Sequence, residues 1–124
     1  MTNRTILIVD DEQHLRELIQ ACLEDLGGWK TTAAGSGEEC LQILQTQTFD
    51  AIILDISMPG MDGYEVYEKL QFNPATKLIP VILLTAKVLP SDRDRFNKMG
   101  VNGVITKPVQ PLTLTKEIAE ILGW

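Results

Sequence analysis

Acidic side chains follow two apolar runs of the sequence at the points where those runs end. Asp55 comes directly after the run 51–54, and a turn-rich segment, residues 56–63, follows it at once. Asp10 and Asp11 come after another short apolar run in the same way. A carboxylate placed where a buried strand meets a loop is held rigidly at the surface, and binding and catalytic residues concentrate on such loops. We therefore place the candidate reaction site around Asp55.

Two further polar side chains, Thr85 and Lys107, also follow apolar segments. Taken singly, each group has an ordinary explanation: Asp11 could cap a helix, Thr85 could bond its own backbone, and Lys107 could be solvated. Their joint occurrence at the ends of four segments is much harder to explain by chance. If the segments are parallel strands of one sheet, all of these side chains converge at the same edge of it.

The chemistry of such a cluster is specific. Three carboxylates, those of Asp10, Asp11 and Asp55, would repel one another by about 4 kcal/mol for each pair about 4 Å apart at moderate dielectric. Lys107 can offset one of these negative charges. A hard divalent cation could neutralise the others, and oxygen ligands at an open site suit Mg²⁺. Such an ion also binds a phosphoryl group, whose other oxygens Lys107 and the Thr85 hydroxyl could contact. The pattern therefore predicts that Asp55 accepts a phosphoryl group.

Composition indicates an ordinary globular protein. At 124 residues the chain is expected to form one domain, residues 1–124, with 44% hydrophobic and 23% charged residues. The formal net charge of -6 disfavours nucleic-acid binding, which needs a basic face. No apolar run approaches the ~20 residues of a membrane span and the start does not resemble a signal peptide, so we expect a cytoplasmic location without membrane attachment. Cys22 and Cys40 lie in apolar-periodic segments, so we expect buried thiols and no zinc site.

Apolar runs and amphipathic stretches alternate along the chain. The strand-like segments are residues 6–9, 29–34, 51–54, 81–84 and 103–106. Helical spacing of apolar residues follows each of them. The pattern predicts helices over residues 15–26, 36–44, 64–71, 91–99 and 114–122.

Local signals mark where three of these helices begin or end. Two glycines, residues 27–28, are expected to stop the first helix. Ser36 with Glu39 forms a capping box that opens the second helix. Ser91 with Asp94 is expected to open the fourth in the same way.

Five successive β-α units predict a doubly wound α/β fold, in which helices cover both faces of a five-stranded parallel sheet. Residues 29–34 are the most polar strand and residues 103–106 form a short one, so we place both at edges. The order 2-1-3-4-5 of a flavodoxin-like (βα)5 fold satisfies this, and its crevice lies between strands 1 and 3. Those strands lead to Asp10 and Asp55.

Four segments together resemble the receiver domain of two-component response regulators of the chemotaxis-regulator type. They are residues 6–12 (ILIVDDE), 54–65 (LDISMPGMDGYE), 84–86 (LTA) and 106–108 (TKP). In order and spacing the resemblance covers nearly the whole chain. It implies that Asp55 takes its phosphoryl group from a histidine of a sensor histidine kinase or a histidine phosphotransfer protein.

The resemblance also implies the ligands of a magnesium ion. The side chains of Asp11 and Asp55 would bind it directly, and the backbone carbonyl of Ser57 would be a third ligand. Asp10 would act through a bound water molecule. Thr85 would contact the phosphoryl group, and Lys107 would form an ion pair with it.

The chain departs from the family pattern at Val104, where receiver domains usually carry Tyr or Phe. We therefore expect signalling to depend more on the loop formed by residues 87–90. The residues two positions beyond Asp55 and Thr85, Ser57 and Lys87, are expected to tune the lifetime of the acyl phosphate, in a direction that the sequence does not assign. The bond between Lys107 and Pro108 is expected to be cis, as in the family.

These features predict a single-domain signalling module that catalyses its own phosphorylation and dephosphorylation but is not otherwise an enzyme. Phosphorylation would change its binding to a downstream protein, and a phosphorylation-linked homodimer stays open. Two alternatives remain. Val104 allows an interaction module that never takes phosphate. An aspartyl-phosphate phosphohydrolase is the other, although such an enzyme would normally carry an acid where this chain has Ser57.

Overall fold

The computed structural model describes residues 3–86 and 89–124, in which strands and helices alternate. The strands are β1 (Thr5–Val9), β2 (Lys30–Ala34), β3 (Ala51–Asp55), β4 (Val81–Thr85) and β5 (Gly103–Thr106). The helices are α1 (Gln13–Asp25), α2 (Gly37–Leu44), α3 (Gly63–Phe72), α4 (Pro90–Met99) and α5 (Leu114–Leu122). All neighbouring strands pair in parallel, and the order is β2-β1-β3-β4-β5. The predicted fold class and strand order are therefore confirmed.

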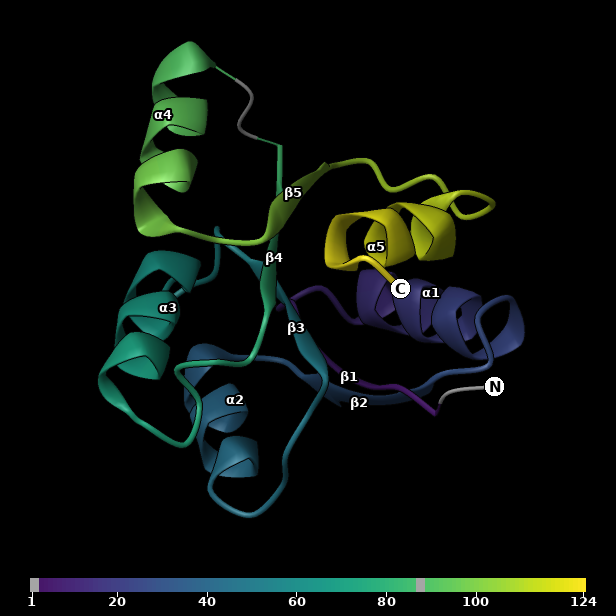
Figure 1. The fold of residues 1–124 in the computed structure, drawn as a ribbon, viewed down its shortest axis with the longest axis horizontal. Coiled ribbons are helices and arrows are strands. Elements are labelled where there is room, and N and C mark those ends of the chain that lie inside the picture. The colour runs from purple at the N-terminus through teal and green to yellow at the C-terminus, as the bar shows by residue number, and fades with distance from the viewer. Residues whose placement is uncertain (1–2, 87–88) are drawn as a thin grey trace.

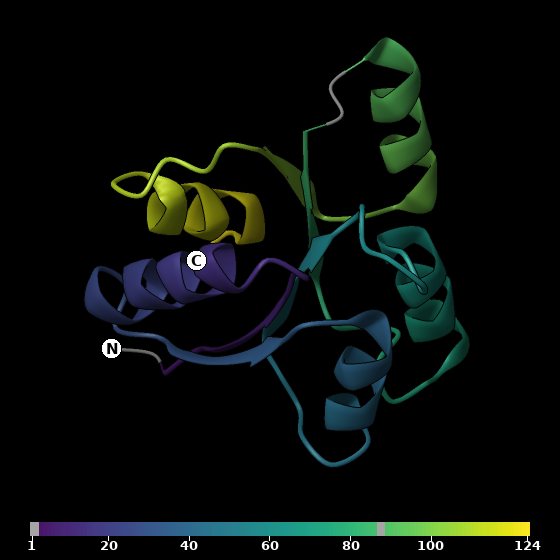
Figure 2. The same ribbon diagram turned by 180° about the vertical axis from the view of Figure 1, so that it is seen from behind.

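The helices form two layers, one on each face of the sheet. Figures 1 and 2 show α1 and α5 on one side of the sheet and α2, α3 and α4 on the other. Alternate residues of each central strand enter the two layers: in β1, Ile6 and Ile8 pack with α1 and α5, whereas Leu7 and Val9 pack on the opposite side. Because both faces are covered, the central strands are apolar at consecutive positions instead of alternating with polar residues.

The edge strands are β2 and β5, as their composition predicts. Four of the five residues of β2 retain solvent exposure, whereas every residue of β3 and β4 is buried. Trp29, which the sequence pattern places in the second strand, precedes β2 and packs edge-on against Trp124 with ring centroids 5.2 Å apart.

Two of the three predicted helix boundaries are confirmed. Gly28 has a left-handed φ of 68° just after α1, a conformation that glycine adopts without steric cost. The hydroxyl of Ser36 accepts a hydrogen bond of 3.1 Å from the backbone N–H of Glu39 at the start of α2. The carboxylate of Glu39 reaches back to the N–H of Gly35, one residue before the cap.

The predicted start of the fourth helix at Ser91 is wrong. Helix α4 begins at Pro90, and Asp92 accepts a hydrogen bond of 3.2 Å from the backbone N–H of Leu89. Proline favours the first helical position because its fixed φ suits a helix and its missing N–H would have no partner there. The helix therefore starts one residue early, and Asp94 lies too far along it to cap.

Cys22 and Cys40 are both buried free thiols, as expected. Burial raises the pKa of Cys40 to about 12. Among the helices of the described ranges, none is long and apolar enough to cross a membrane.

Candidate functional site

The carboxyl ends of four strands bring the predicted site residues to one edge of the sheet. Asp55 and Thr85 are the last residues of β3 and β4, one position further along each strand than the sequence pattern indicates. Asp10 directly follows β1 and Lys107 directly follows β5. The parallel register aligns these ends, since Val9 pairs with Leu54 and Asp55 with Leu84.

Lys107 joins the two buried carboxylates of the site. Its Nζ lies 3.1 Å from Oδ2 of Asp10 and 3.2 Å from Oδ1 of Asp55. Asp10 is 0% exposed and Asp55 is 1% exposed, so the lysine compensates charges that water cannot reach. The lysine is therefore held at the site by two ion pairs, with its side chain 23% exposed.

One backbone N–H group also donates a hydrogen bond to each of these two carboxylates. The N–H of Glu12 donates a hydrogen bond of 2.8 Å to Oδ1 of Asp10. The N–H of Ser57 donates one of 3.3 Å to Oδ1 of Asp55. These bonds orient the two side chains from the loops that follow their strands.

The site fits a hard divalent cation. Asp10, Asp11 and Asp55 each offer a carboxylate oxygen, and these oxygens lie within 4.8 Å of one another. The Oδ2 atom of Asp55 is buried and accepts no hydrogen bond from the described residues. Asp11 is exposed, so the group of oxygens borders solvent on the side of Asp11. A buried oxygen without a donor, beside two further carboxylates at an open edge, is a donor set that suits Mg²⁺.

Asp11 does not serve as the helix cap that its position also allowed. The N-cap of α1 is Glu12, whose side chain makes no capping hydrogen bond. Asp11 thus lies in the loop between Asp10 and α1, beside the other two carboxylates.

The electrostatics of the site perturb two groups. Burial first, and the charge of Asp10 second, raise the pKa of Asp55, while Lys107 and the Ser57 N–H lower it; the net result is a pKa of about 6. For Lys107, burial lowers the pKa, but hydrogen bonding and charge from Asp10 and Asp55 outweigh it and leave the pKa raised. Lys107 alone therefore does not fully stabilise the ionised form of Asp55.

Gly63 positions the loop after Asp55 and was not identified from the sequence. Its backbone N–H donates a hydrogen bond of 2.8 Å to the carbonyl of Ile56, which closes the loop 56–63. A Cβ at this position would overlap the backbone carbonyl of Asp55. The signal in the sequence was the pair of Asp62 and Gly63, in which Asp62 caps α3 by accepting a hydrogen bond of 3.0 Å from the Glu65 N–H.

One expected family feature and one departure from the family lie near Lys107, in β5 and directly after it. The Lys107–Pro108 bond is cis, as the resemblance implied. Val104 is partly buried and packs against the core under α2, α3 and α4. Lys87, expected to tune the acyl phosphate, lies outside the described residues, as does the first half of the loop 87–90.

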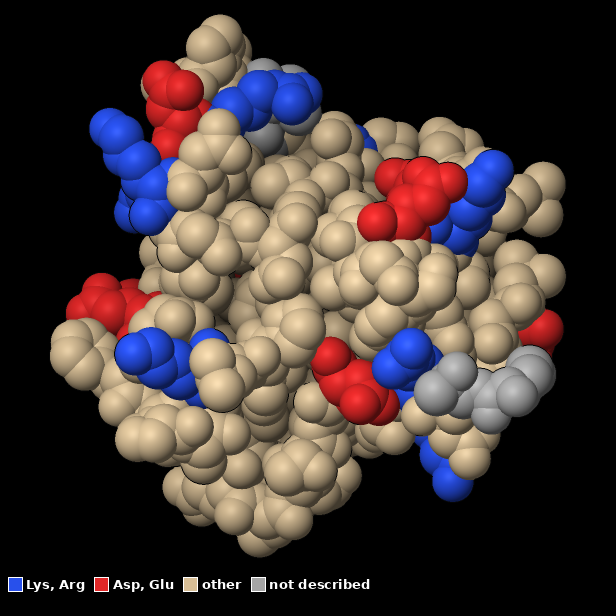
Figure 3. Space-filling view, in the orientation of Figure 1, with Lys and Arg blue, Asp and Glu red and all other residues tan. Residues whose placement is uncertain are grey.

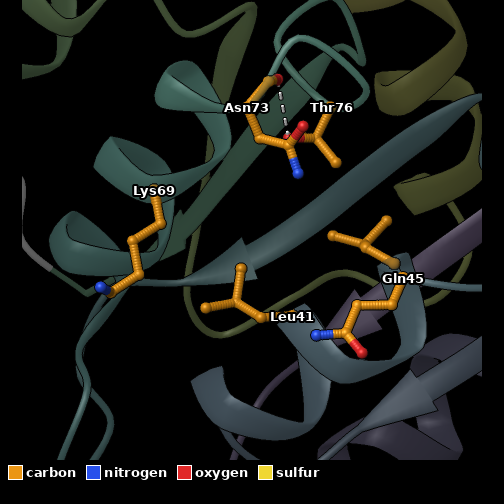
Figure 4. Close-up of a pocket in the computed structure, with 6 residues that line it drawn as sticks. Leu41, Gln45, Lys69, Asn73 and Thr76 are labelled. Atoms are coloured by element: carbon orange, nitrogen blue, oxygen red, sulfur yellow. Dashed lines mark hydrogen bonds between the residues drawn. The ribbon is translucent and has the colours of Figure 1, made fainter.

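Two hollows differ in their relation to this site. One of about 380 Å³ borders Lys107 and is lined mainly by apolar side chains of α1 and of the segment after β5. Another, of about 220 Å³, lies between α2 and α3 near the carboxyl ends of both helices (Figure 4). Because Asp55 ends β3 and α3 runs back from that edge of the sheet, this hollow lies away from Asp55. The second is smaller than the ~300 Å³ of usual ligand pockets and contains no acidic lining residue, so we assign it no chemistry.

The face of the molecule drawn in Figure 3 shows basic and acidic side chains interspersed on a largely uncharged surface. It carries no continuous basic area of the kind that binds nucleic acid.

The chain matches known proteins over nearly its whole length. The family described as the response regulator receiver domain matches residues 6–119. A response regulator of Synechocystis is 35% identical over 119 residues, which make up 96% of this chain and 52% of that protein. The chemotaxis protein CheY-3 of Vibrio cholerae is 34% identical over 119 residues, which make up 96% of this chain and 92% of that protein. The chain thus spans about half of the first relative and most of the second.

Solved structures give the same result. The chemotaxis response regulator CheY4 of Vibrio cholerae superposes with a TM-score of 0.89 at 31% identity, covering 97% of this chain and 99% of that one. The receiver domain of a sensor histidine kinase of Pseudomonas aeruginosa, described with a magnesium ion coordinated in its active site cleft, gives a TM-score of 0.85 at 28% identity. That match covers 99% of this chain and 100% of that one. The resemblance read from the sequence motifs is confirmed.

Proposed function

The chain belongs to the response regulator receiver domain family, and we propose that it is a signalling module whose Asp55 takes a phosphoryl group from a phosphohistidine. The observation that carries the proposal is the arrangement of the two buried carboxylates. Asp10 and Asp55 share Lys107, while one oxygen of Asp55 has no donor among the described residues and lies beside the exposed Asp11. That oxygen is free to form a new bond.

The proposed reaction is a phosphoryl transfer in line. A carboxylate oxygen of Asp55 forms a bond to phosphorus as the bond from phosphorus to the donor's imidazole nitrogen breaks. The donor's imidazole, protonated at its other ring nitrogen before the transfer, leaves as neutral imidazole, and Asp55 becomes an acyl phosphate. Lys107 then forms an ion pair with a phosphoryl oxygen, and the hydroxyl of Thr85 donates a hydrogen bond to another. Attack by water on the phosphorus later breaks the bond from phosphorus to the Asp55 oxygen, which releases inorganic phosphate and regenerates the carboxylate.

We propose that Mg²⁺ is the cofactor. The side chains of Asp11 and Asp55 and the backbone carbonyl of Ser57 would hold it directly, with Asp10 acting through water. When bound, the ion supplies positive charge that neutralises the carboxylates and the phosphoryl oxygens. The magnesium ion of the Pseudomonas aeruginosa receiver domain supports this assignment.

The phosphodonor is proposed to be a sensor histidine kinase or a histidine phosphotransfer protein. The hollow beside Lys107 offers it an apolar contact surface that includes Leu15, Leu18, Pro108 and Val109. A donor seated there would present its phosphohistidine next to Lys107. The phosphorylated form would then bind a downstream protein in the cytoplasm.

Val104 favours one alternative, an interaction module whose output does not depend on phosphate. A small side chain at this position cannot make the aromatic movement that links phosphorylation to partner binding in the family. The phosphohydrolase alternative has less support, since Ser57 offers no acid beside the acceptor.

One experiment separates these functions. The protein is incubated with Mg²⁺ and acetyl phosphate and its intact mass is measured over time. We expect a single phosphate adduct that disappears in Asp55→Asn and persists in Asp94→Asn, a control at an exposed position of α4. The absence of any adduct without consumption of acetyl phosphate would favour the interaction module. Rapid consumption without an adduct would favour the phosphohydrolase.

A further inference from the structure

We propose that Arg16 is a positioning residue for the metal site: its guanidinium fixes the backbone at Asp10, so that the neighbouring Asp11 faces Asp55. The proposal rests on the proposed function, because it concerns the Mg²⁺ site of that function. Arg16 is not itself a ligand. It would act through the peptide that connects two of the acidic residues.

The contact to Asp10 is direct. Arg16 lies in the first turn of α1, where long side chains lean toward the amino end of the helix. Its Nη1 donates a hydrogen bond of 2.8 Å to the backbone carbonyl oxygen of Asp10. The side chain is partly buried, which protects this bond from competition with water.

The guanidinium also rests against the turn between β2 and α2. A Cβ built on Gly35 would lie 3.2 Å from Nη1 and 3.5 Å from Cζ of Arg16, so the absence of a side chain at Gly35 leaves room for the guanidinium. This turn is itself braced, because the N–H of Gly35 donates to the Glu39 carboxylate. Arg16 therefore connects the carboxyl end of β1 to a rigid support at the end of β2.

Asp11 depends on this connection more than its neighbours do. Asp10 and Asp55 are oriented by Lys107 and by backbone N–H groups. The side chain of Asp11 is exposed and makes no hydrogen bond or ion pair with any residue that the structure describes. Its position is therefore set by its backbone.

The backbone next to Asp11 has two tertiary restraints. The N–H of Asp10 donates a hydrogen bond of 3.1 Å to the carbonyl of Ala34, and the carbonyl of Asp10 accepts the bond from Arg16. The second can be removed by substitution of Arg16 without changing Asp10, whose own carboxylate accepts a local hydrogen bond from the Glu12 N–H. A planar guanidinium with fixed donors suits this role, whereas the flexible ammonium of lysine keeps the charge without the geometry.

The test is Mg²⁺ affinity of the unphosphorylated protein, measured by titration calorimetry in wild type, Arg16→Gln and Arg16→Lys. For Arg16→Gln we expect a dissociation constant for Mg²⁺ about tenfold larger than that of the wild type. An effect of this size is usual when a group that orients a metal ligand is removed. Arg16→Lys should also be weaker than wild type, by about threefold or more, because charge alone does not hold the peptide. Arg93→Gln, at an exposed position of α4, makes the same charge change and should bind as wild type does.

A second variant disturbs the contact between Arg16 and Gly35 by changing the glycine. Gly35→Ala keeps Arg16 but places a methyl group against its guanidinium, so it should weaken Mg²⁺ binding in the wild-type background. In the Arg16→Gln background the same substitution should have no further effect, since residues in contact couple in a double-mutant cycle. Circular dichroism of each variant checks that the fold is retained, and Gly35→Ala keeps the test available if Arg16→Gln does not fold.

The outcomes are distinguishable. Unchanged Mg²⁺ affinity in Arg16→Gln, wild-type affinity in Arg16→Lys, or additive effects in the cycle would each overturn the positioning role while leaving the proposed function intact. No Mg²⁺ binding by the wild type would instead overturn the metal assignment of the proposed function, and the role of Arg16 with it.

Discussion

Asp55, the proposed phosphoryl acceptor, lowers the stability of the fold at neutral pH. Its pKa rises from an ordinary 3.8 to about 6 in the folded protein, first through burial and then through the charge of Asp10. Between these values the folded state binds more protons than the unfolded state. The stability linked to this group is therefore fully present below pH 3.8 and is lost as the pH rises through about 6.

The variant Asp55→Asn should for this reason be more stable than the wild type at neutral pH. In EDTA at pH 7.5 we expect its free energy of unfolding to be higher than that of the wild type by about 1 to 3 kcal/mol. The upper value is the most that a pKa difference of this size allows. The gain should shrink toward zero at pH 4, where the wild-type carboxyl is protonated. Urea denaturation followed by the fluorescence of the packed Trp29 and Trp124 measures it. A gain that does not change with pH would contradict the explanation.

Substitution of Lys107 should have the opposite effect and lower the stability of the fold. In Lys107→Gln the carboxylates of Asp10 and Asp55 lose their shared cation while they stay buried, so we expect a loss of about 3 kcal/mol at pH 7.5. The loss should be smaller at pH 5, because protonation then relieves Asp55. Lys116→Gln is the matched control.

The pair that this control removes joins Lys116 to Glu120 at 3.9 Å between largely exposed side chains. Exposed pairs of this kind contribute little, so its loss should be below about 0.5 kcal/mol. Equal losses in the two lysine variants, measured in the same urea series, would mean that the ion pairs in the site contribute no more than a surface pair.

Residues of the site were predictable to the extent that they follow strands. Asp10, Asp55 and Lys107 could be found because a change from apolar to polar residues marks the end of a strand in the sequence itself. Gly63 and Arg16 could not be found in this way. Their roles depend on contacts with residues of other segments, and no local pattern records such contacts.

At the scale of elements, continuous apolar runs in the sequence located the central strands. The first residue of a helix was harder to predict, because neighbouring residues offer alternative caps. The prediction for α4 failed because Ser91 and Asp94 form a plausible capping pair, whereas in the structure Asp92 accepts a hydrogen bond from the Leu89 N–H and Pro90 takes the first helical position. The order of the strands was accessible because residues 29–34, the most polar of the strand-like segments, suit an edge position.

The connection from β3 to α3 should tolerate no side chain at Gly63. In Gly63→Ala the methyl group would overlap the Asp55 carbonyl, so the loop must shift, and we expect a loss of about 1 to 3 kcal/mol in stability. The yield of the Asp55 adduct from acetyl phosphate should fall as well, because the acceptor strand moves with the loop.

Gly123→Ala is a useful comparison for Gly63→Ala. Gly123 has a φ of 73° but open space around it, so only conformational strain of about 1 kcal/mol is expected there, and the adduct yield should not change. Denaturation and intact-mass measurements on both variants test the difference. A normal adduct yield in Gly63→Ala would show that the loop does not position the acceptor.

At the scale of the whole molecule, the reaction site and the proposed donor surface are neighbours but are built from different residues. The carboxylates lie at the ends of the strands, whereas the hollow beside Lys107 is lined by apolar residues of α1 and of the segment before α5. Substitutions can therefore separate recognition of the donor from the chemistry of transfer.

We expect Leu18→Glu to slow phosphoryl transfer from a histidine phosphotransfer protein at least tenfold while the reaction with acetyl phosphate stays unchanged. Leu18 is 39% exposed at this hollow, and a charge there would have to be buried when the donor docks. Leu78→Glu, at a residue that is 88% exposed between α3 and β4, should change neither rate. Transfer rates followed with labelled donor test this, and equal slowing of both reactions would place the effect in the site instead.

The sheet divides the interior into two separate cores, one under α1 and α5 and the other under α2, α3 and α4. Among the described residues, the two cores are separate clusters on opposite faces of the sheet, so we expect substitutions on one side to add to those on the other in free energy. Descendants of this sequence could therefore rebuild the helices on one face for a new partner without disturbing the packing of the other. The acidic cluster lies at the ends of the strands that both cores share, and it would remain in place through such a change.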